Sequence, residues 1–487
     1  MSKLTIWLTP IWILAVGVTI GALILLLMWG VTWLVNRRAA RSIAEAVGEG
    51  ILRPISYVVI SMAALALLAS PSMPVERIMA SLKRLPDVAP IVEKVEVGPR
   101  KADVEIPASF RATELQSFTI TSDQDVAVNV AAKKGFVEPL ILVQGGEPYS
   151  WSPGSSTPRG FEGDVTTVYV TNESDSPANV SIQMYTDVET PQVRAIPIAA
   201  ASTIGLYVLY LLVRFLAPRT SVIAAATAKE TIAQPLFTML VMIGIVALVA
   251  FVFIPYNTFG EDVKMLKTSG MTMIKVLAII MALWTASTSV ADEIEGRTAL
   301  TVLSKPVGRR QFIVGKFLGI LWPIVLMFVI LGIVFLLTVS FKVVYDARES
   351  AKTTPEWTEC YLEVVRIIPG LVLAFLEAVI LAAISVAVST RLPMLPNLVI
   401  CGSIYVLGHL AALIVKSAAG EIVFVRFIGK LLSVILPVLD HFEIEGAIAG
   451  ASSVPMSYLG WALLYSVLYS GAAILLALIF FEDRDLA

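Results

Sequence analysis

About nine apolar stretches, each roughly 20 residues or longer, constrain the fold of this chain more than any other feature, because each is long enough to cross a bilayer. Hydrocarbon offers no partner for an unpaired backbone amide, so such stretches fold as helices. Charged residues make up 15% of the chain, whereas a soluble domain carries about 25%. We therefore predict a mainly α, polytopic helical membrane protein. Its predicted spans lie near residues 8–35, 51–71, 194–216, 235–255, 270–290, 313–338, 367–389, 397–416 and 458–481.

Residues 72–192 break the apolar pattern. Short runs rich in β-branched residues, such as 117–121 and 179–185, are separated by Gly-Gly and Ser-Pro-Gly turn sequences. Several short strands with such turns are typical of a small β-sandwich. We predict four regions: two helices in 1–71, an inserted β-rich domain in 72–192, a third helix with a cytoplasmic linker in 193–224, and a six-helix core in 225–487.

Basic residues in the short loops set the orientation of the chain. Arg37, Arg38 and Arg41 follow the first span, and Arg214 and Arg219 follow the third. Short loops rich in Lys and Arg stay in the cytoplasm. With an odd number of spans, this places the N-terminus outside and the C-terminus inside. We expect a multi-pass protein of a bacterial cytoplasmic (inner) membrane, with the β-rich domain extracytoplasmic.

The charge and histidine content exclude two classes of function. The net charge is −2, so there is no basic excess of the kind that binds nucleic acid. The two histidines, His409 and His441, lie far apart in sequence and form no local metal-binding motif. We expect neither a nucleic-acid partner nor a metal site.

A dense charged island, residues 292–311, separates the fifth and sixth spans. Glu293 and Arg297 are four residues apart and can pair on one helical face. Ser304 precedes Lys305 and Pro306 as a plausible N-cap, with a proline that the first turn of a helix tolerates. The island therefore predicts the end of one helix, a bend and a new helix. A solvated, positively charged cytoplasmic loop would explain its basic residues, but not the order of acidic, polar, proline and basic positions.

The run 292–319 resembles the intracellular loop of ABC-2 type transporter permeases, the membrane-spanning subunits of ATP-binding-cassette transporters. The segment 228–237 is similar to the interfacial segment of these permeases, and the resemblance covers about residues 225–487. It implies a permease half that dimerises and docks on cytosolic ATPase subunits, with the loop as the coupling element. The resemblance assigns coupling to Asp292, Glu293, Glu295, Gly296, Arg297, Thr298, Ser304, Lys305, Pro306, Arg309 and Arg310, and interfacial positions to Lys229, Glu230 and Pro235.

The chain has no Gly-x-x-x-x-Gly-Lys-Ser/Thr phosphate loop, so it lacks the backbone cradle that holds nucleotide phosphates. We expect this chain to be no enzyme and to bind no cofactor, with ATP and Mg²⁺ held by a partner ATPase subunit. The substrate is not readable from the sequence. The alternative function is a non-transporting membrane scaffold or sensor, whose external β domain binds a ligand or a protein.

Two polar residues lie inside predicted spans. A carboxylate such as Glu377 costs at least about 2.5 kcal/mol at the centre of a membrane helix, so it should face the bundle. His409 lies in the next span and is a candidate partner. A proton- or cation-linked site and a hydrogen-bonded packing pair are both open interpretations, and the second is favoured.

Overall fold

The computed structural model describes residues 3–48, 51–132, 139–254, 262–296, 308–416 and 454–482, with parts of 423–444. The chain divides into two compact units. One unit is helical and comprises Met1–Ser72 and Ile198–Ala487, and the other comprises Met73–Pro197 and contains every described strand. The predicted fold class, a helical membrane protein with an inserted β domain, is therefore confirmed.

Eight described helices are long and apolar enough to cross a membrane. The ninth predicted span, 397–416, falls within the helix α13 (Met394–Lys416), of which Met394–Leu410 is an apolar helical stretch among the described residues. The helical unit consists of α1 (Lys3–Val35), α2 (Arg37–Gly48), α3 (Leu52–Ala69), η1 (Ser70–Ser72), α5 (Ala195–Leu216), α6 (Pro218–Ala233), α7 (Pro235–Phe253), α8 (Asp262–Ala286), η4 (Ser287–Ala291), α9 (Asp292–Glu295), α11 (Arg309–Glu349), α12 (Trp357–Ser389), α13 (Met394–Lys416), η6 (Leu439–Phe442) and α16 (Met456–Glu482).

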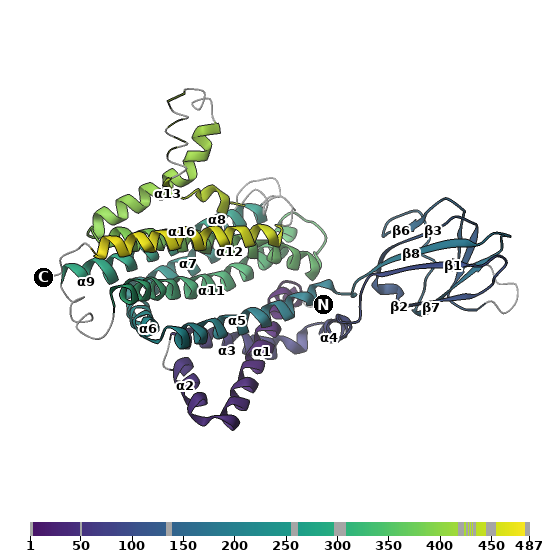
Figure 1. The fold of residues 1–487 in the computed structure, drawn as a ribbon, viewed down its shortest axis with the longest axis horizontal. Helices are drawn as coiled ribbons and strands as arrows, with labels where there is room; N and C mark the ends of the chain where they lie inside the picture. Colours follow the sequence, from purple (N-terminus) through teal and green to yellow (C-terminus); the bar gives the residue numbers. More distant parts are fainter. Residues whose placement is uncertain are drawn as a thin grey trace. The chain divides into compact units, whose positions relative to one another are not determined.

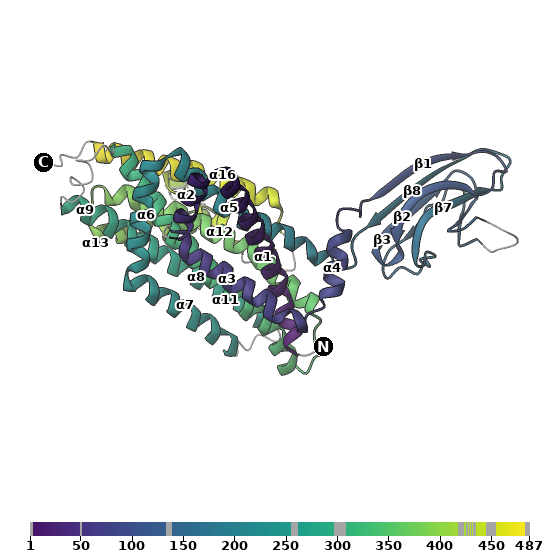
Figure 2. The ribbon, with the colours of Figure 1, turned by 90° about the horizontal axis from the view of Figure 1, so that it is seen from below.

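The long helices of this unit run alongside one another, and the start of α1 and the end of α16 lie at its opposite ends (Figures 1 and 2). At one end, the Thr5 hydroxyl donates to the carbonyl of Ser72 at 3.1 Å. At the other, the Arg309 guanidinium donates to the carbonyl of Glu482 at 2.6 Å. We call this second end, which carries α9, the start of α11 and the end of α16, the loop face.

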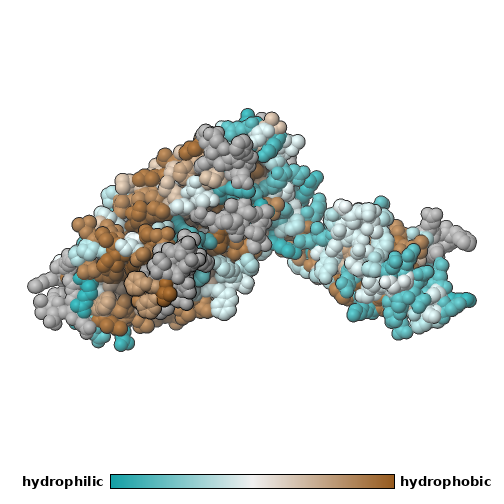
Figure 3. Space-filling model, turned by 90° about the horizontal axis from the view of Figure 1, so that it is seen from above, coloured by the Kyte–Doolittle hydropathy of each residue, from teal (hydrophilic) through white to brown (hydrophobic). Residues whose placement is uncertain are grey.

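Burial separates central from peripheral helices. In the most apolar window of α12, 72% of residues are buried, and in that of α8, 67%, against 22% for α3. Large apolar side chains such as Leu67 and Phe215 are exposed on the outer helices. The view in Figure 3 shows apolar surface over this unit and more hydrophilic surface over the β unit. Such an outer surface suits lipid contact, whereas α8 and α12 form the core of the bundle.

The β unit is a pair of antiparallel four-stranded sheets, with orders β1-β8-β3-β6 and β2-β7-β4-β5. Its core is one cluster of inward-facing side chains, in which Phe161 meets Phe110 and Phe118 edge to face at 5.5 and 5.2 Å. This is the β-sandwich arrangement that the turn-separated strands predict. The elements are α4 (Val75–Arg84), β1 (Ile91–Val97), β2 (Val104–Arg111), η2 (Ala112–Glu114), β3 (Leu115–Ser122), β4 (Val126–Asn129), β5 (Ile141–Val143), β6 (Tyr149–Trp151), β7 (Asp164–Asn172), β8 (Ala178–Thr186) and η3 (Pro191–Arg194).

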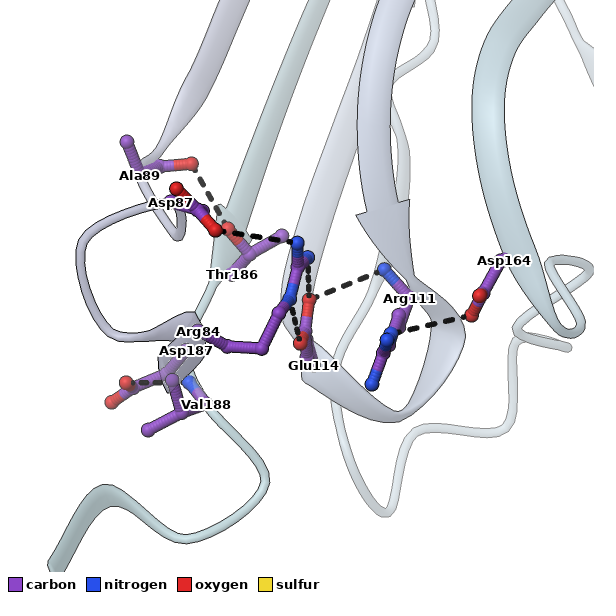
Figure 4. A network of polar contacts seen from close by, with 9 residues as sticks. All are labelled: Arg84, Asp87, Ala89, Arg111, Glu114, Asp164, Thr186, Asp187 and Val188. Carbon is purple, nitrogen blue, oxygen red and sulfur yellow. Dashed lines mark hydrogen bonds and ion pairs between the residues drawn. The ribbon is translucent and has the colours of Figure 1, made fainter. Parts of the chain in front are cut away.

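A polar network fixes α4 to this sandwich (Figure 4). Two Arg84 nitrogens donate to the two carboxylate oxygens of Glu114 at 3.1 and 2.9 Å, and the Arg111 amide donates to the same carboxylate at 3.3 Å. These contacts hold the pKa of Glu114 below its ordinary value, with the Arg84 hydrogen bond as the main cause. A bidentate arginine fixes the orientation of α4 as well as its position.

Candidate functional site

The helix before the charged island ends in an unusual way. A π-helical turn, η4, follows α8 and leads into α9. The Asn397 amide donates to the hydroxyls of Ser287 and Ser385, both at 2.8 Å, which links η4 to α12 and α13. Single π-turns inside helices occur often at functional sites. Here the turn and its amide clamp set the direction in which α9 reaches the loop face.

A buried ion pair joins α9 to the sixth predicted span. Lys316, in the second turn of α11, contacts the Glu293 carboxylate. The Lys316 side chain is only 6% exposed, so it does not extend to the surface as a long cationic side chain near a helix end often does. The expected partner of Glu293, Arg297, lies outside the described residues, so the predicted pair stays a prediction. The contact with Lys316 fixes α9 against the start of α11.

Two glycines bring the same part of α11 against α6. A Cβ at Gly319 would lie 2.6 Å from Thr227 Cβ and 2.9 Å from the Ala224 carbonyl, and a Cβ at Gly315 would lie 2.8 Å from Ile223 Cβ. Only glycine allows so close an approach of two helices at these positions. The Gly315-Lys316 pair, which superficially resembles part of a phosphate loop, is a packing surface and one half of an ion pair.

The end of α16 completes the loop face. Phe481 stacks on Phe312 with ring centroids 5.7 Å apart, and the Arg309 guanidinium lies 5.9 Å from the centroid of the Phe481 ring. Together with the hydrogen bond from Arg309 to the Glu482 carbonyl, these contacts join the start of α11 to the last described residue of the chain. The loop face is therefore a packed surface built from α9, the start of α11 and the end of α16, with α6 packed on the glycines of α11.

The predicted loop residues fall into three groups. Asp292, Gly296, Arg309 and Arg310 are exposed, and Glu293 is half-buried. Glu295 is the last residue of α9. The predicted residues that lie outside the described part of the chain are Arg297, Thr298, Ser304, Lys305 and Pro306.

The interfacial residues belong to α6 and α7. Lys229 and Glu230 are exposed on α6, the helix that packs on the two glycines of α11. Pro235 is the first residue of α7, a position that suits proline because the first helical amides have no intrahelical acceptor. The α6 residues that contact the two glycines, Ile223, Ala224 and Thr227, lie just before the predicted interfacial segment 228–237.

The two predicted intramembrane polar residues meet inside the bundle. His409 Nε2 lies 3.4 Å from Glu377 Oε1, and Lys275 Nζ from α8 lies 3.5 Å from Glu377 Oε2. Glu443, which follows η6, lies 3.1 Å from both Lys275 Nζ and His409 Nε2. These four residues, which we call the buried charge cluster, come from α8, α12, α13 and the segment after η6. Glu377 is fully buried, whereas the Glu443 side chain is 39% exposed.

A contact with the backbone constrains the His409 tautomer in the cluster. His409 Nδ1 is 2.9 Å from the carbonyl of Tyr405, which only accepts, so Nδ1 carries a hydrogen. A neutral imidazole would then present a bare Nε2 to the carboxylates of Glu377 and Glu443, and three acceptors would face one another. A proton added to the cluster would turn these contacts into hydrogen bonds, and it would leave the two carboxylates balanced by Lys275 and one further positive charge.

Reasoning from the sequence missed four residues that organise these sites: Lys275, Lys316, Asn397 and Glu443. Lys275 lies in an apolar helix, and the rule that marks Glu377 as an intramembrane charge marks it equally. Lys316 lies near the end of a predicted span, where a lysine side chain commonly reaches the surface, so the sequence gives no sign of its buried partner. Asn397 and Glu443 carry no local signal, because their importance comes from contacts with residues far along the chain.

Residues 256–419 match the model of a family described as ABC-2 family transporter protein. The matched segment is about a third of the chain, and it contains η4, α9, the start of α11 and all members of the buried charge cluster except Glu443. The predicted resemblance to ABC-2 permeases is confirmed over these residues. A search of curated proteins gives no significant match to the chain.

Proposed function

Since residues 256–419 belong to the ABC-2 transporter family, we propose that this chain is the permease subunit through which a separate ATPase drives transport of a substrate across a membrane. The family normally pairs with an ATPase subunit, and the described helices make a multi-pass membrane protein. ATP and Mg²⁺ are then held by the partner, and two permease halves form the transport path. The cytoplasmic side is the loop face.

The family match carries this proposal, and the loop face supports it. Coupling requires a surface that a soluble partner can reach and that is firmly attached to the membrane helices. Asp292 and Arg310 are exposed, and they stand on α9 and α11, which the Glu293–Lys316 contact joins. A partner that binds these exposed charges would therefore act on two helices at once.

The test reverses exposed charges without disturbing internal contacts. Glu293 is unsuitable, because its reversal would place a second cation beside buried Lys316. We choose Asp292→Lys with Arg310→Glu, and Arg348→Glu at the opposite end of α11 as the control, since Arg348 is also exposed. Like charges at a buried interface cost several kcal/mol, so ATPase recovery should fall at least about tenfold.

The permease is co-expressed with the cassette ATPase that copurifies with the wild-type chain, and Mg²⁺-dependent ATP hydrolysis is measured in the purified complex. Wild type and Arg348→Glu should retain the activity, whereas the double variant should lose it and still elute as a folded membrane protein. Undiminished hydrolysis with the double variant would exclude the loop face as the docking surface.

A further inference from the structure

An apolar cavity of about 540 Å³ lies between α1, α2, α3 and α5, outside the segment that matches the transporter family. Its volume falls within the range of small-molecule sites, roughly 300 to 1,000 Å³. The lining is almost wholly apolar and includes Leu25, Trp29, Ile43, Val47 and Ile60. In a unit surrounded by lipid, such a cavity suits a hydrocarbon chain.

Specific contacts hold the walls of this cavity in place. Figure 1 shows α1 and α2 as the two arms of a V. The Trp29 indole on α1 joins the two arms by donating a hydrogen bond to the carbonyl of Ala40 on α2 at 3.0 Å. On the opposite wall, the hydroxyls of Ser56 and Tyr207 are 2.8 Å apart and join α3 to α5. The cavity is therefore a built feature of the four helices.

The helix α2 is amphipathic, and its polar side is basic. Arg37 and Arg41 are exposed and share one row of the helix with Ala44 and Gly48, which line the cavity. Basic amphipathic helices of this kind lie in the headgroup region of a membrane. This row of α2 therefore carries exposed arginines at its first two positions and cavity-lining residues at its last two.

A second arginine approaches the cavity from α3. Arg53 is exposed and lies one helical turn before Ser56, which lines the cavity. Its Nε donates to the Tyr57 hydroxyl at 2.8 Å. Within the described part of the chain, neither Arg41 nor Arg53 has a carboxylate within salt-bridge distance. The two arginines, each within one helical turn of a cavity-lining residue and without an acidic partner there, are therefore free to pair with an anion.

We propose that this cavity binds an anionic glycerophospholipid of the surrounding bilayer, with an acyl chain between α1 and α3 and the phosphate against Arg41 and Arg53. Apolar volume explains the chain, and charge complementarity explains the headgroup, because a zwitterionic lipid would offer the arginines no net negative charge. Each basic residue near an anionic membrane surface contributes about 1 kcal/mol, a factor of about five in affinity.

Trp29 is a reporter inside the proposed site. The full chain is reconstituted into vesicles of phosphatidylcholine and phosphatidylglycerol, with brominated acyl chains on one lipid at a time, and tryptophan quenching is measured. The signal of Trp29 is obtained as the difference from a Trp29→Phe variant. Phosphatidylglycerol should be preferred at this position at least about fivefold.

Two variants test the headgroup and a third tests the cavity. Arg41→Gln with Arg53→Gln should reduce the preference to below about twofold, whereas Arg214→Gln with Arg219→Gln, which removes the same charge from the end of α5 and the start of α6, should leave it unchanged. Ala44→Phe fills the cavity and should lower quenching of Trp29 by either lipid.

Three results would overturn the proposal. Equal quenching of Trp29 by the two brominated lipids would show a non-selective lipid contact. A preference that survives Arg41→Gln with Arg53→Gln would place the headgroup elsewhere. Absence of quenching by either lipid would show that protein, such as a second copy of this chain, covers the cavity. None of these measurements depends on the proposed transport function.

Discussion

Replacing Lys275 by methionine should destabilise the helical unit more than any other single change in the buried charge cluster. The substitution keeps the length of the side chain but leaves Glu377 and Glu443 facing one another across His409. Even with one proton added, the cluster would then carry a net negative charge inside the bundle. By contrast, Glu377→Gln leaves Lys275 paired with Glu443 and needs no added proton for neutrality.

The distances set the magnitude. At an effective dielectric constant of about 20, unit charges separated by 3.5 Å or 3.1 Å, as Lys275 is from Glu377 and Glu443, attract by roughly 5 kcal/mol per pair. Desolvation offsets much of this attraction, and removing one partner of a buried pair costs about 3 to 5 kcal/mol. We expect that cost for Lys275→Met, and about 1 to 2 kcal/mol for Glu377→Gln, which loses hydrogen bonds but strands no charge.

A double-mutant cycle provides the assay, with chemical unfolding in mixed micelles as the readout. The double variant Lys275→Met with Glu377→Gln removes one charge of each sign and should recover about 1 to 3 kcal/mol relative to Lys275→Met alone. Lys229→Met, at an exposed position on α6, is the control for loss of a lysine. The reasoning fails if Lys275→Met unfolds like wild type, or if Glu377→Gln gives it no recovery.

Three further predictions concern other parts of the chain. Gly319→Ala should lower the free energy of unfolding by about 1 to 3 kcal/mol by overpacking against α6. Gly460→Ala, where an added Cβ meets no atom within 4 Å, should stabilise α16 by about 0.5 to 1 kcal/mol. Thermal unfolding would show these opposite signs. Glu114→Gln should destabilise the β unit by about 1.5 to 3 kcal/mol at pH 7. Arg84 lowers the Glu114 pKa in the folded state. The extra stability of the wild-type β unit over Glu114→Gln is therefore present above the unfolded pKa of about 4.3, and this advantage is lost as the pH falls through the lower folded pKa. Hydrogen exchange at pH 7 and pH 3 measures it, and an advantage equally large at both pH values would contradict the assignment. A cysteine at Ser155 should react with an impermeant thiol reagent in intact cells, and reaction only after lysis would reverse the predicted topology.

Length and apolarity were enough to predict the helices, because the bilayer permits few other solutions for segments of that kind. The ninth predicted span, 397–416, likewise falls within a helix, α13. In the β unit, the alternation of β1 was concealed by Glu93, a charged residue at a half-buried, inward-facing position of the strand. The hydrophobic pattern therefore predicts the fold class of each unit, but not every helix and strand in it.

The candidate sites were less predictable, since their contacts join distant positions. Glu377 and His409 were identified because each is polar in an apolar span. Their contacts with Lys275 and Glu443 depend on how the helices and the segment after η6 pack together. The partner of Glu293 is 23 residues away. Sequence periodicity predicts which residues share a helix face, and it cannot predict which face of another helix they meet.

The contact between α6 and α11 has a mechanical consequence. Flexible side chains between two helices can change rotamer when one helix is displaced, so the other helix need not move. At Gly315 and Gly319 no side chain of α11 can adjust in this way, because the backbone of α11 lies directly against Ile223, Ala224 and Thr227. A displacement of α6 by a few tenths of an ångström must move α11 by a similar amount, so the two helices behave as one stiff lever.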